Sequence, residues 1–148
     1  MNDDINLFPA PSNQQPLDNT FTFNVGAGDK TAEHSIFFRD PSADDWSLAG
    51  GNGSIAGKNL FDFMMFLKAP ETDIPGQTYT LTNGLTFVHR FSVTSPSGWI
   101  GHRVVYASQA SLTITINIAA GTAKGTFSAQ FAEPALTVNG SFDLLRTV

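Results

Sequence analysis

The sequence predicts an all-β chain, an antiparallel β-sandwich or flattened barrel of about nine or ten strands. Between residues 110 and 146, apolar side chains recur at every second position, which is the period of a strand with one buried face. Turn signals, of which Asn83-Gly84 is the strongest, separate such runs at short and even intervals. The chain is 148 residues long, which suits one domain with a single core.

The alternation in the last third resolves into a three-stranded meander. Its first run places Leu112, Ile114 and Ile116 on one face and polar residues on the other. Two further runs, residues 126–131 and 136–144, repeat the alternation after short turns. Short connections favour antiparallel neighbours, so we expect one sheet with an apolar face. The rest of the chain must then supply the layer that covers it.

Patterns earlier in the chain predict seven more strands. Residues 1–16 are rich in Pro, Asn and Gln and predict an irregular N-terminal arm, while residues 17–148 form the domain. Residues 50–58 contain four glycines without the spacing of a phosphate-binding or dinucleotide-binding loop, and we expect a turning glycine loop there. The expected strands cover residues 21–25, 34–39, 46–49, 60–68, 78–82, 85–94 and 99–108.

Composition excludes several partners. The net charge is −5 and the eight basic residues are scattered singly, so we expect no nucleic-acid partner. The longest apolar run spans only residues 63–67, so no membrane-spanning helix is expected. The absence of cysteine excludes disulfides and thiolate metal sites. No basic segment precedes an apolar stretch near Met1, so no secretory signal is visible, and the localisation is either cytoplasmic or exported by another route.

Four short stretches carry a resemblance to a known group of proteins. They read PGQTYTL at residues 75–81, SLTITI at 111–116, KGTFS at 124–128 and NGSF at 139–142. This pattern, over about the last half of the chain, resembles small bacterial β-sandwich domains that are often exported lipoproteins of uncharacterised function. The resemblance implies the sandwich fold and supplies no catalytic residues. The lipobox cysteine of such lipoproteins is absent from this sequence.

Three histidines and one acidic segment are candidate metal ligands. His34, His89 and His102 each fall in a predicted strand, but without the close spacing of zinc ligands, which favours hydrogen-bonded core or rim positions. Residues 40–45 contain three aspartates without the pattern of an EF-hand, which favours a capping turn. We therefore predict no metal and no other cofactor. Asp62 lies between phenylalanines, either buried with a raised pKa or, as we favour, as an edge-strand gatekeeper.

The sequence indicates a non-catalytic binding module, because no catalytic motif is present. Trp46, Trp99 and Tyr106 lie near predicted loops, where aromatic rings can stack on a sugar ring or on a partner's side chain. A role as core filler is the alternative for each ring. We expect a carbohydrate ligand first and a protein partner second. The alternatives are a carrier of an apolar ligand between the sheets and a hydrolase without a recognisable motif.

Residues 60–68 are apolar on both faces of a strand, whereas a two-layer sandwich covers only one face of each strand. Leu60, Met64 and Phe66 lie on the second face. We therefore expect a homodimer or a partner complex built on these three residues, since two-fold dimers are the commonest oligomers. The alternative cover is the N-terminal arm with Leu7-Phe8.

Overall fold

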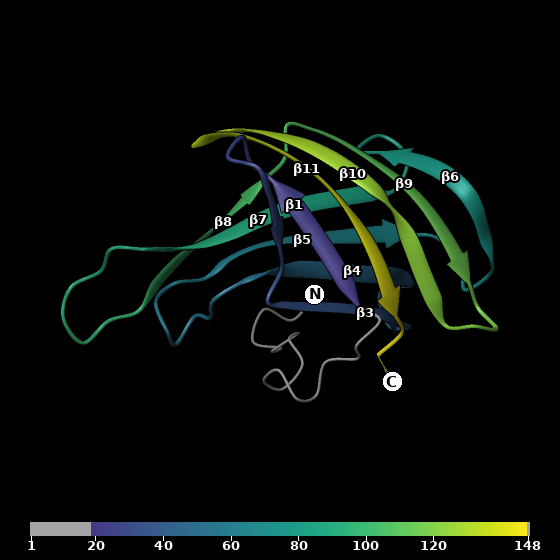
Figure 1. Cartoon of the computed structure of the whole chain (residues 1–148), viewed down its shortest axis with the longest axis horizontal. Helices are drawn as coiled ribbons and strands as arrows, with labels where there is room; N and C mark the ends of the chain where they lie inside the picture. Colours follow the sequence, from purple (N-terminus) through teal and green to yellow (C-terminus); the bar gives the residue numbers. More distant parts are fainter. Residues whose placement is uncertain (1–18, 148) are drawn as a thin grey trace.

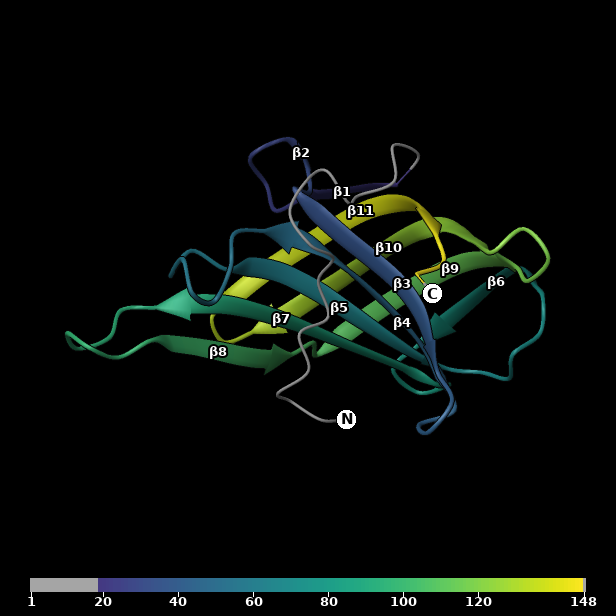
Figure 2. The same cartoon turned by 90° about the horizontal axis from the view of Figure 1, so that it is seen from below.

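The chain forms two antiparallel β-sheets packed face to face, as Figure 1 and Figure 2 show in two views. The structure is a computed structural model and describes residues 19–147. The six-stranded sheet has the order β2 (Asp29–Thr31), β1 (Thr20–Asn24), β11 (Ala135–Leu145), β10 (Thr122–Ala132), β9 (Gln109–Asn117), β6 (Ile74–Thr80). The five-stranded sheet has the order β3 (His34–Asp40), β4 (Asp45–Asn52), β5 (Phe61–Lys68), β7 (Leu85–Val93), β8 (Gly101–Tyr106).

The sandwich form of the prediction is confirmed, with eleven strands among the described residues in place of nine or ten. The additional strand, β2, has three exposed residues and therefore no apolar alternation to reveal it. Strand β6 begins at Ile74 and not at Thr78, because a bulge lets the chain pair with β9 on both sides of Pro75 and Gly76. The expected N-terminal arm, residues 1–16, lies outside the described residues. Within residues 19–147, no helix is long and apolar enough to cross a membrane.

The space between the sheets is filled largely by phenylalanine rings. Phe127 of the six-stranded sheet lies 5.2 Å from Phe21 and 5.6 Å from Phe87 between ring centroids, so the two layers interlock. Phe63 of the opposite sheet reaches Phe131 at 6.3 Å. Aromatic pairs at these separations contribute beyond their buried area. The two sheets are thus in contact through these rings.

The meander predicted from the last third of the chain is present as β9, β10 and β11. Leu112, Ile114 and Ile116 are buried between the sheets, while the residues between them on β9 face outward. The pairings of β10 with β9 and with β11 are antiparallel and continuous. The expected register of β9 is therefore the observed one.

Replacing Ile116 with alanine is expected to lower the free energy of unfolding by about 2–4 kcal/mol, because its buried side chain would leave a cavity. Thr115→Ala, on the exposed side of the same strand, should cost well under about 1 kcal/mol. Urea unfolding of both variants measures the two losses. Equal losses would mean that the register of β9, or its assignment as a strand, is wrong.

Part of the expected glycine loop is strand. Gly50 and Gly51 belong to β4, and the loop begins only after Asn52. A Cβ atom at Gly50 would lie 2.2 Å from the ring of Phe21, and one at Gly51 would lie 2.4 Å from the Cα atom of Asp62. These glycines are needed because other residues pack where their side chains would be.

Candidate functional site

The structure separates the three aromatic residues that the sequence grouped as ligand contacts. Trp46 is completely buried on the inner face of β4, so its predicted role in ligand stacking is wrong. Its ring stacks on Phe37 at 5.2 Å between centroids, and the guanidinium groups of Arg39 and Arg146 lie 5.1 and 5.2 Å from the centre of the Trp46 ring. Trp46 is instead a core residue, which was the alternative role considered for this ring.

Trp99 and Tyr106 are both exposed, at 70% and 69% of their surface. Trp99 ends the turn that joins β7 to β8, where its N–H donates to the carbonyl oxygen of Pro96 at 3.0 Å. Tyr106 is the last residue of β8. Six residues lie between them, and the strand from Gly101 to Tyr106 alone spans about 17 Å, so the two rings do not form one stacking platform.

Among residues 19–147, most of the large hydrophobic side chains with high exposure belong to the β7–β8 hairpin. Among the described residues, four of the five large hydrophobic side chains with high exposure lie between positions 99 and 106. They are Trp99, Ile100, Val104 and Tyr106. Figure 1 shows the hairpin extending past the ends of the other strands. Exposed apolar groups concentrated in this way are typical of a contact surface, whereas scattered ones are not.

Strand β8 also presents backbone hydrogen-bonding groups at the edge of its sheet. The N–H of Ala107 donates to Phe87 of β7 at 2.9 Å. Because backbone direction alternates along a strand, Arg103 and Val105 also direct their N–H and C=O groups to β7. His102, Val104 and Tyr106 therefore direct theirs away from the sheet, and no described strand lies beyond them.

The three other sheet edges carry features that prevent edge pairing. Strand β2 is only three residues long and includes Asp29 and Lys30, while β6 contains Pro75 and a bulge. The edge of β3 is capped, since the N–H of Thr147 donates to the carbonyl oxygen of Phe37 at 2.7 Å. Short strands, charges, proline and bulges are the usual means of blocking an edge. Within residues 19–147, the β8 edge has no proline, no bulge and no such cap, and its one Lys or Arg residue is Arg103.

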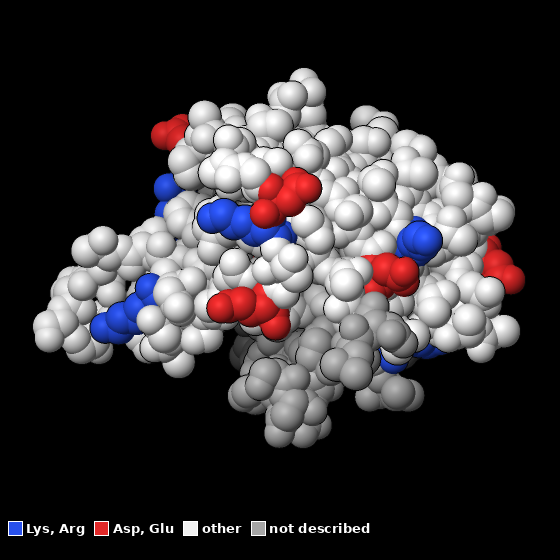
Figure 3. All heavy atoms as spheres, viewed as in Figure 1, with Lys and Arg blue, Asp and Glu red and all other residues white. Residues whose placement is uncertain are grey.

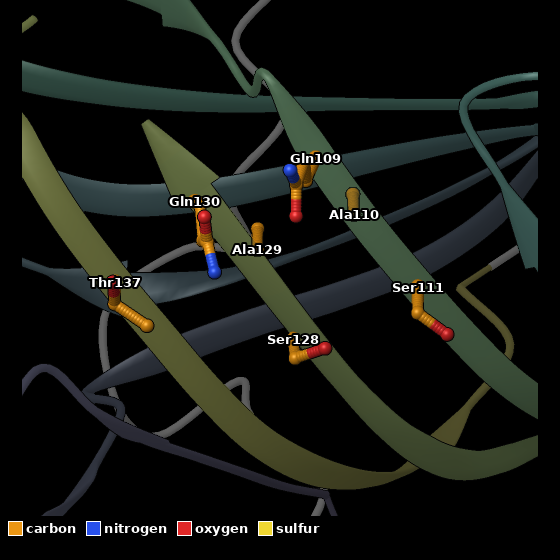
Figure 4. Close-up of a pocket in the computed structure, with 7 residues that line it drawn as sticks. All are labelled: Gln109, Ala110, Ser111, Ser128, Ala129, Gln130 and Thr137. Carbon is orange, nitrogen blue, oxygen red and sulfur yellow. The ribbon is translucent and has the colours of Figure 1, made fainter. Parts of the chain in front are cut away.

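The outer face of the six-stranded sheet is polar and carries a shallow depression (Figure 4). Its volume is about 180 Å³, below the roughly 300–1,000 Å³ of typical ligand pockets. Its lining offers only hydroxyl, amide and methyl groups from β9, β10 and β11. The lining residues are Gln109, Ala110, Ser111, Ser128, Ala129, Gln130 and Thr137. This depression is too small and too open to be the main binding site.

The three histidines do not converge. His89 is buried on the inner face of β7 and stacks on Phe63 at 4.5 Å, with Nδ1 2.8 Å from the carbonyl oxygen of Asp62. Burial lowers the pKa of His89, so it is neutral near pH 7. His34 and His102 lie on the outer face, on opposite edge strands β3 and β8. No three His, Asp or Glu side chains within residues 19–147 are grouped to hold a metal ion.

The aspartates of residues 40–45 form a capping turn. One carboxylate oxygen of Asp40 accepts hydrogen bonds from the hydroxyl and the N–H of Ser42, at 2.7 and 3.0 Å, and the hydroxyl lowers the pKa of Asp40. Asp44 forms an ion pair with Arg39. The carboxylates of Asp40 and Asp44 are thus engaged within the turn and with β3, respectively.

Asp62 is a buried ion-pair partner in a central strand, and its interpretation as an edge gatekeeper is wrong. Strand β5 lies between β4 and β7, and the side chain of Asp62 is completely buried. Arg90 donates to both carboxylate oxygens, from Nε at 3.1 Å and from Nη2 at 2.7 Å. Burial raises the pKa of Asp62 and outweighs the opposing effect of Arg90.

The face expected to form a dimer interface is not open. Leu60 and Met64 are each only 2% exposed, and Phe66 is half-buried. Met64 belongs to a second apolar cluster on the outer face of the five-stranded sheet, with Ile36, Ala49 and Val88. An interface built on Leu60 and Met64 would need side chains that are accessible, so this prediction is corrected. The alternative cover, Leu7-Phe8, lies outside the described residues.

Comparison of the chain with models of protein families, with curated proteins and with solved structures gives no match. The resemblance to bacterial β-sandwich domains therefore stays a prediction.

Proposed function

We propose that this chain is a non-catalytic binding module that recognises a protein partner through the β8 edge. One observation carries the proposal. The exposed apolar side chains concentrate at residues 99–106, and these residues include the edge strand that no described part of the chain protects. An extended segment of a partner can add to such an edge as a further strand, with backbone hydrogen bonds providing affinity and side chains providing specificity.

A protein partner fits this surface better than a carbohydrate. The outward N–H and C=O groups of His102, Val104 and Tyr106 repeat at every second residue, which is the spacing of a strand. Carbohydrate recognition by stacking would favour aromatic rings in one platform, but Trp46 is buried and Trp99 lies far from Tyr106. Figure 3 shows blue and red side chains intermixed, several of them side by side, with no large patch of one sign, so that face does not favour a strongly charged partner.

The test is selection from a library of random peptides with the whole chain as bait. Val104→Pro removes an N–H group that points away from β7, so it blocks the edge while leaving the β7–β8 hydrogen bonds intact. Val104→Thr keeps the N–H and the branched shape and is the matched control. We expect the wild type and Val104→Thr to enrich extended peptides with alternating apolar residues, and Val104→Pro to enrich none.

If Val104→Pro enriches the same peptides, the proposal that the β8 edge is the binding surface is wrong. A parallel measurement on immobilised glycans tests the other class of ligand. Glycan binding that is lost in Trp99→Ala, with no peptide enriched, would replace the protein partner with a carbohydrate.

A further inference from the structure

We propose that the partner strand is β8 of a second copy of this chain, paired antiparallel about a two-fold axis at Val104. The inference rests on the proposed function, since it names the partner that occupies the β8 edge. The pairing would join the two five-stranded sheets into one continuous ten-stranded sheet.

The hydrogen-bond directions of β8 select this register. Two antiparallel strands pair residues that direct their backbone groups toward each other, and each such pair exchanges two hydrogen bonds. With the axis at Val104, Val104 pairs with its own copy, and His102 of each chain pairs with Tyr106 of the other. The backbone groups of all three outward-facing residues of β8 then form hydrogen bonds on both chains.

Pairings of the two β8 strands with the two-fold axis moved by one residue are less favourable. An axis at Arg103 would place Arg103 directly opposite its own copy, and like charges directly opposite are destabilising. An axis at Val105 would leave His102 without a partner inside β8. With the axis at Val104, Arg103 lies opposite Val105 of the second copy, so no like charges meet.

The side chains along this line suit a contact between copies. Val104 and Tyr106 are 46% and 69% exposed, and both lie on the outer face of the sheet. Tyr106 is the register neighbour of Val88, which belongs to the buried outer cluster. Pairing would therefore bring the exposed Val104 and Tyr106 of the two chains together beside this buried apolar cluster. Arg103 lies on the other face, with its guanidinium 5.7 Å from the ring of Phe91.

Disulfide cross-linking through introduced cysteines tests the register. The sequence contains no cysteine, so only the introduced thiols can react. Residues of a hydrogen-bonded antiparallel pair have Cα atoms about 5.5 Å apart, within the range that a disulfide spans. We expect Val104→Cys to form disulfide dimers about tenfold faster than Thr126→Cys, which lies on the outer face of the other sheet. His102→Cys and Tyr106→Cys should cross-link rapidly when mixed and slowly when separate.

Sedimentation velocity gives the second readout, with the wild type, Val104→Thr and Val104→Pro at concentrations up to about 200 µM, because a single strand pair is a small interface. We expect a monomer–dimer equilibrium for the first two and a monomer for Val104→Pro. A monomeric wild type whose Val104→Cys variant cross-links no faster than Thr126→Cys would overturn the inference. A dimer that persists in Val104→Pro would also overturn it, by placing the contact elsewhere.

These outcomes separate the inference from the proposed function. If the wild type is monomeric but still selects peptides that Val104→Pro does not bind, the β8 edge binds a different protein and the second copy is excluded. If Val104→Pro fails to fold, as circular dichroism would show, the disulfide rates decide the question without it.

Discussion

Replacing Arg90 with methionine is expected to lower the free energy of unfolding by about 3–5 kcal/mol. Asp62 is completely buried and receives two hydrogen bonds from Arg90, so the variant leaves a buried carboxylate without its cation. Replacing both partners with apolar residues, as in Asp62→Val/Arg90→Met, removes the buried charge and should cost less than the single change. Denaturant unfolding at neutral pH measures both variants. A loss below about 1 kcal/mol for Arg90→Met would mean that the pair behaves like an exposed one.

The pH dependence of that loss has a defined sign. Burial raises the pKa of Asp62 in the folded chain above its unfolded value, so the folded chain binds this proton more tightly. The resulting stabilisation is present at low pH and is lost as the pH rises through the raised pKa. Arg90 opposes the rise, and its removal enlarges the effect. The difference in stability between the wild type and Arg90→Met should therefore shrink from about pH 7 toward about pH 4.

Replacing Gly51 with alanine is expected to cost about 3 kcal/mol or more, because the new Cβ atom has no room. It would lie 2.3 Å from the Cβ atom and 2.4 Å from the Cα atom of Asp62, and 2.4 Å from the carbonyl oxygen of Phe61. Two of these three atoms are backbone, so relief requires β4 and β5 to separate at Gly51 and Asp62, one residue from the end of their pairing.

Gly57→Ala is the control for this change. A Cβ atom there would meet side-chain oxygens of Asn59 and Ser54, at 2.7 and 2.8 Å, in an exposed turn that can adjust. Its cost should stay within about 1 kcal/mol. Thermal or urea unfolding of the two variants compares them directly. Equal stability of Gly51→Ala and the wild type would show that β4 and β5 do not approach as closely as the structure has them.

The fold could be predicted because its strongest signal is local. Along β9 the alternation of Leu112, Ile114 and Ile116 with polar residues defines both the strand and its buried face. The same reasoning failed for Gly50 and Gly51, since their role depends on Phe21 and Asp62, which lie far away in the sequence. A glycine required by a distant neighbour cannot be told from a loop glycine by its own position.

The candidate site was predicted only in part, because it depends on sheet order. Trp99 and Tyr106 were identified as candidate contacts, and both are exposed. Trp46 was grouped with them because it follows an acidic turn, yet its position on β4 directs its ring into the core. Nothing in the sequence shows that β8 is an edge strand, since that follows from long-range pairing.

Residue-resolved hydrogen exchange of β8 tests the central claim, that this edge is open, most directly. The measurement uses a dilution at which sedimentation shows a monomer. We predict fast exchange for the amides of His102, Val104 and Tyr106, which point away from β7, and slow exchange for those of Arg103 and Val105, which point toward it. Equal protection of all five amides in the monomer would show that another part of the chain covers the edge, and would contradict the account.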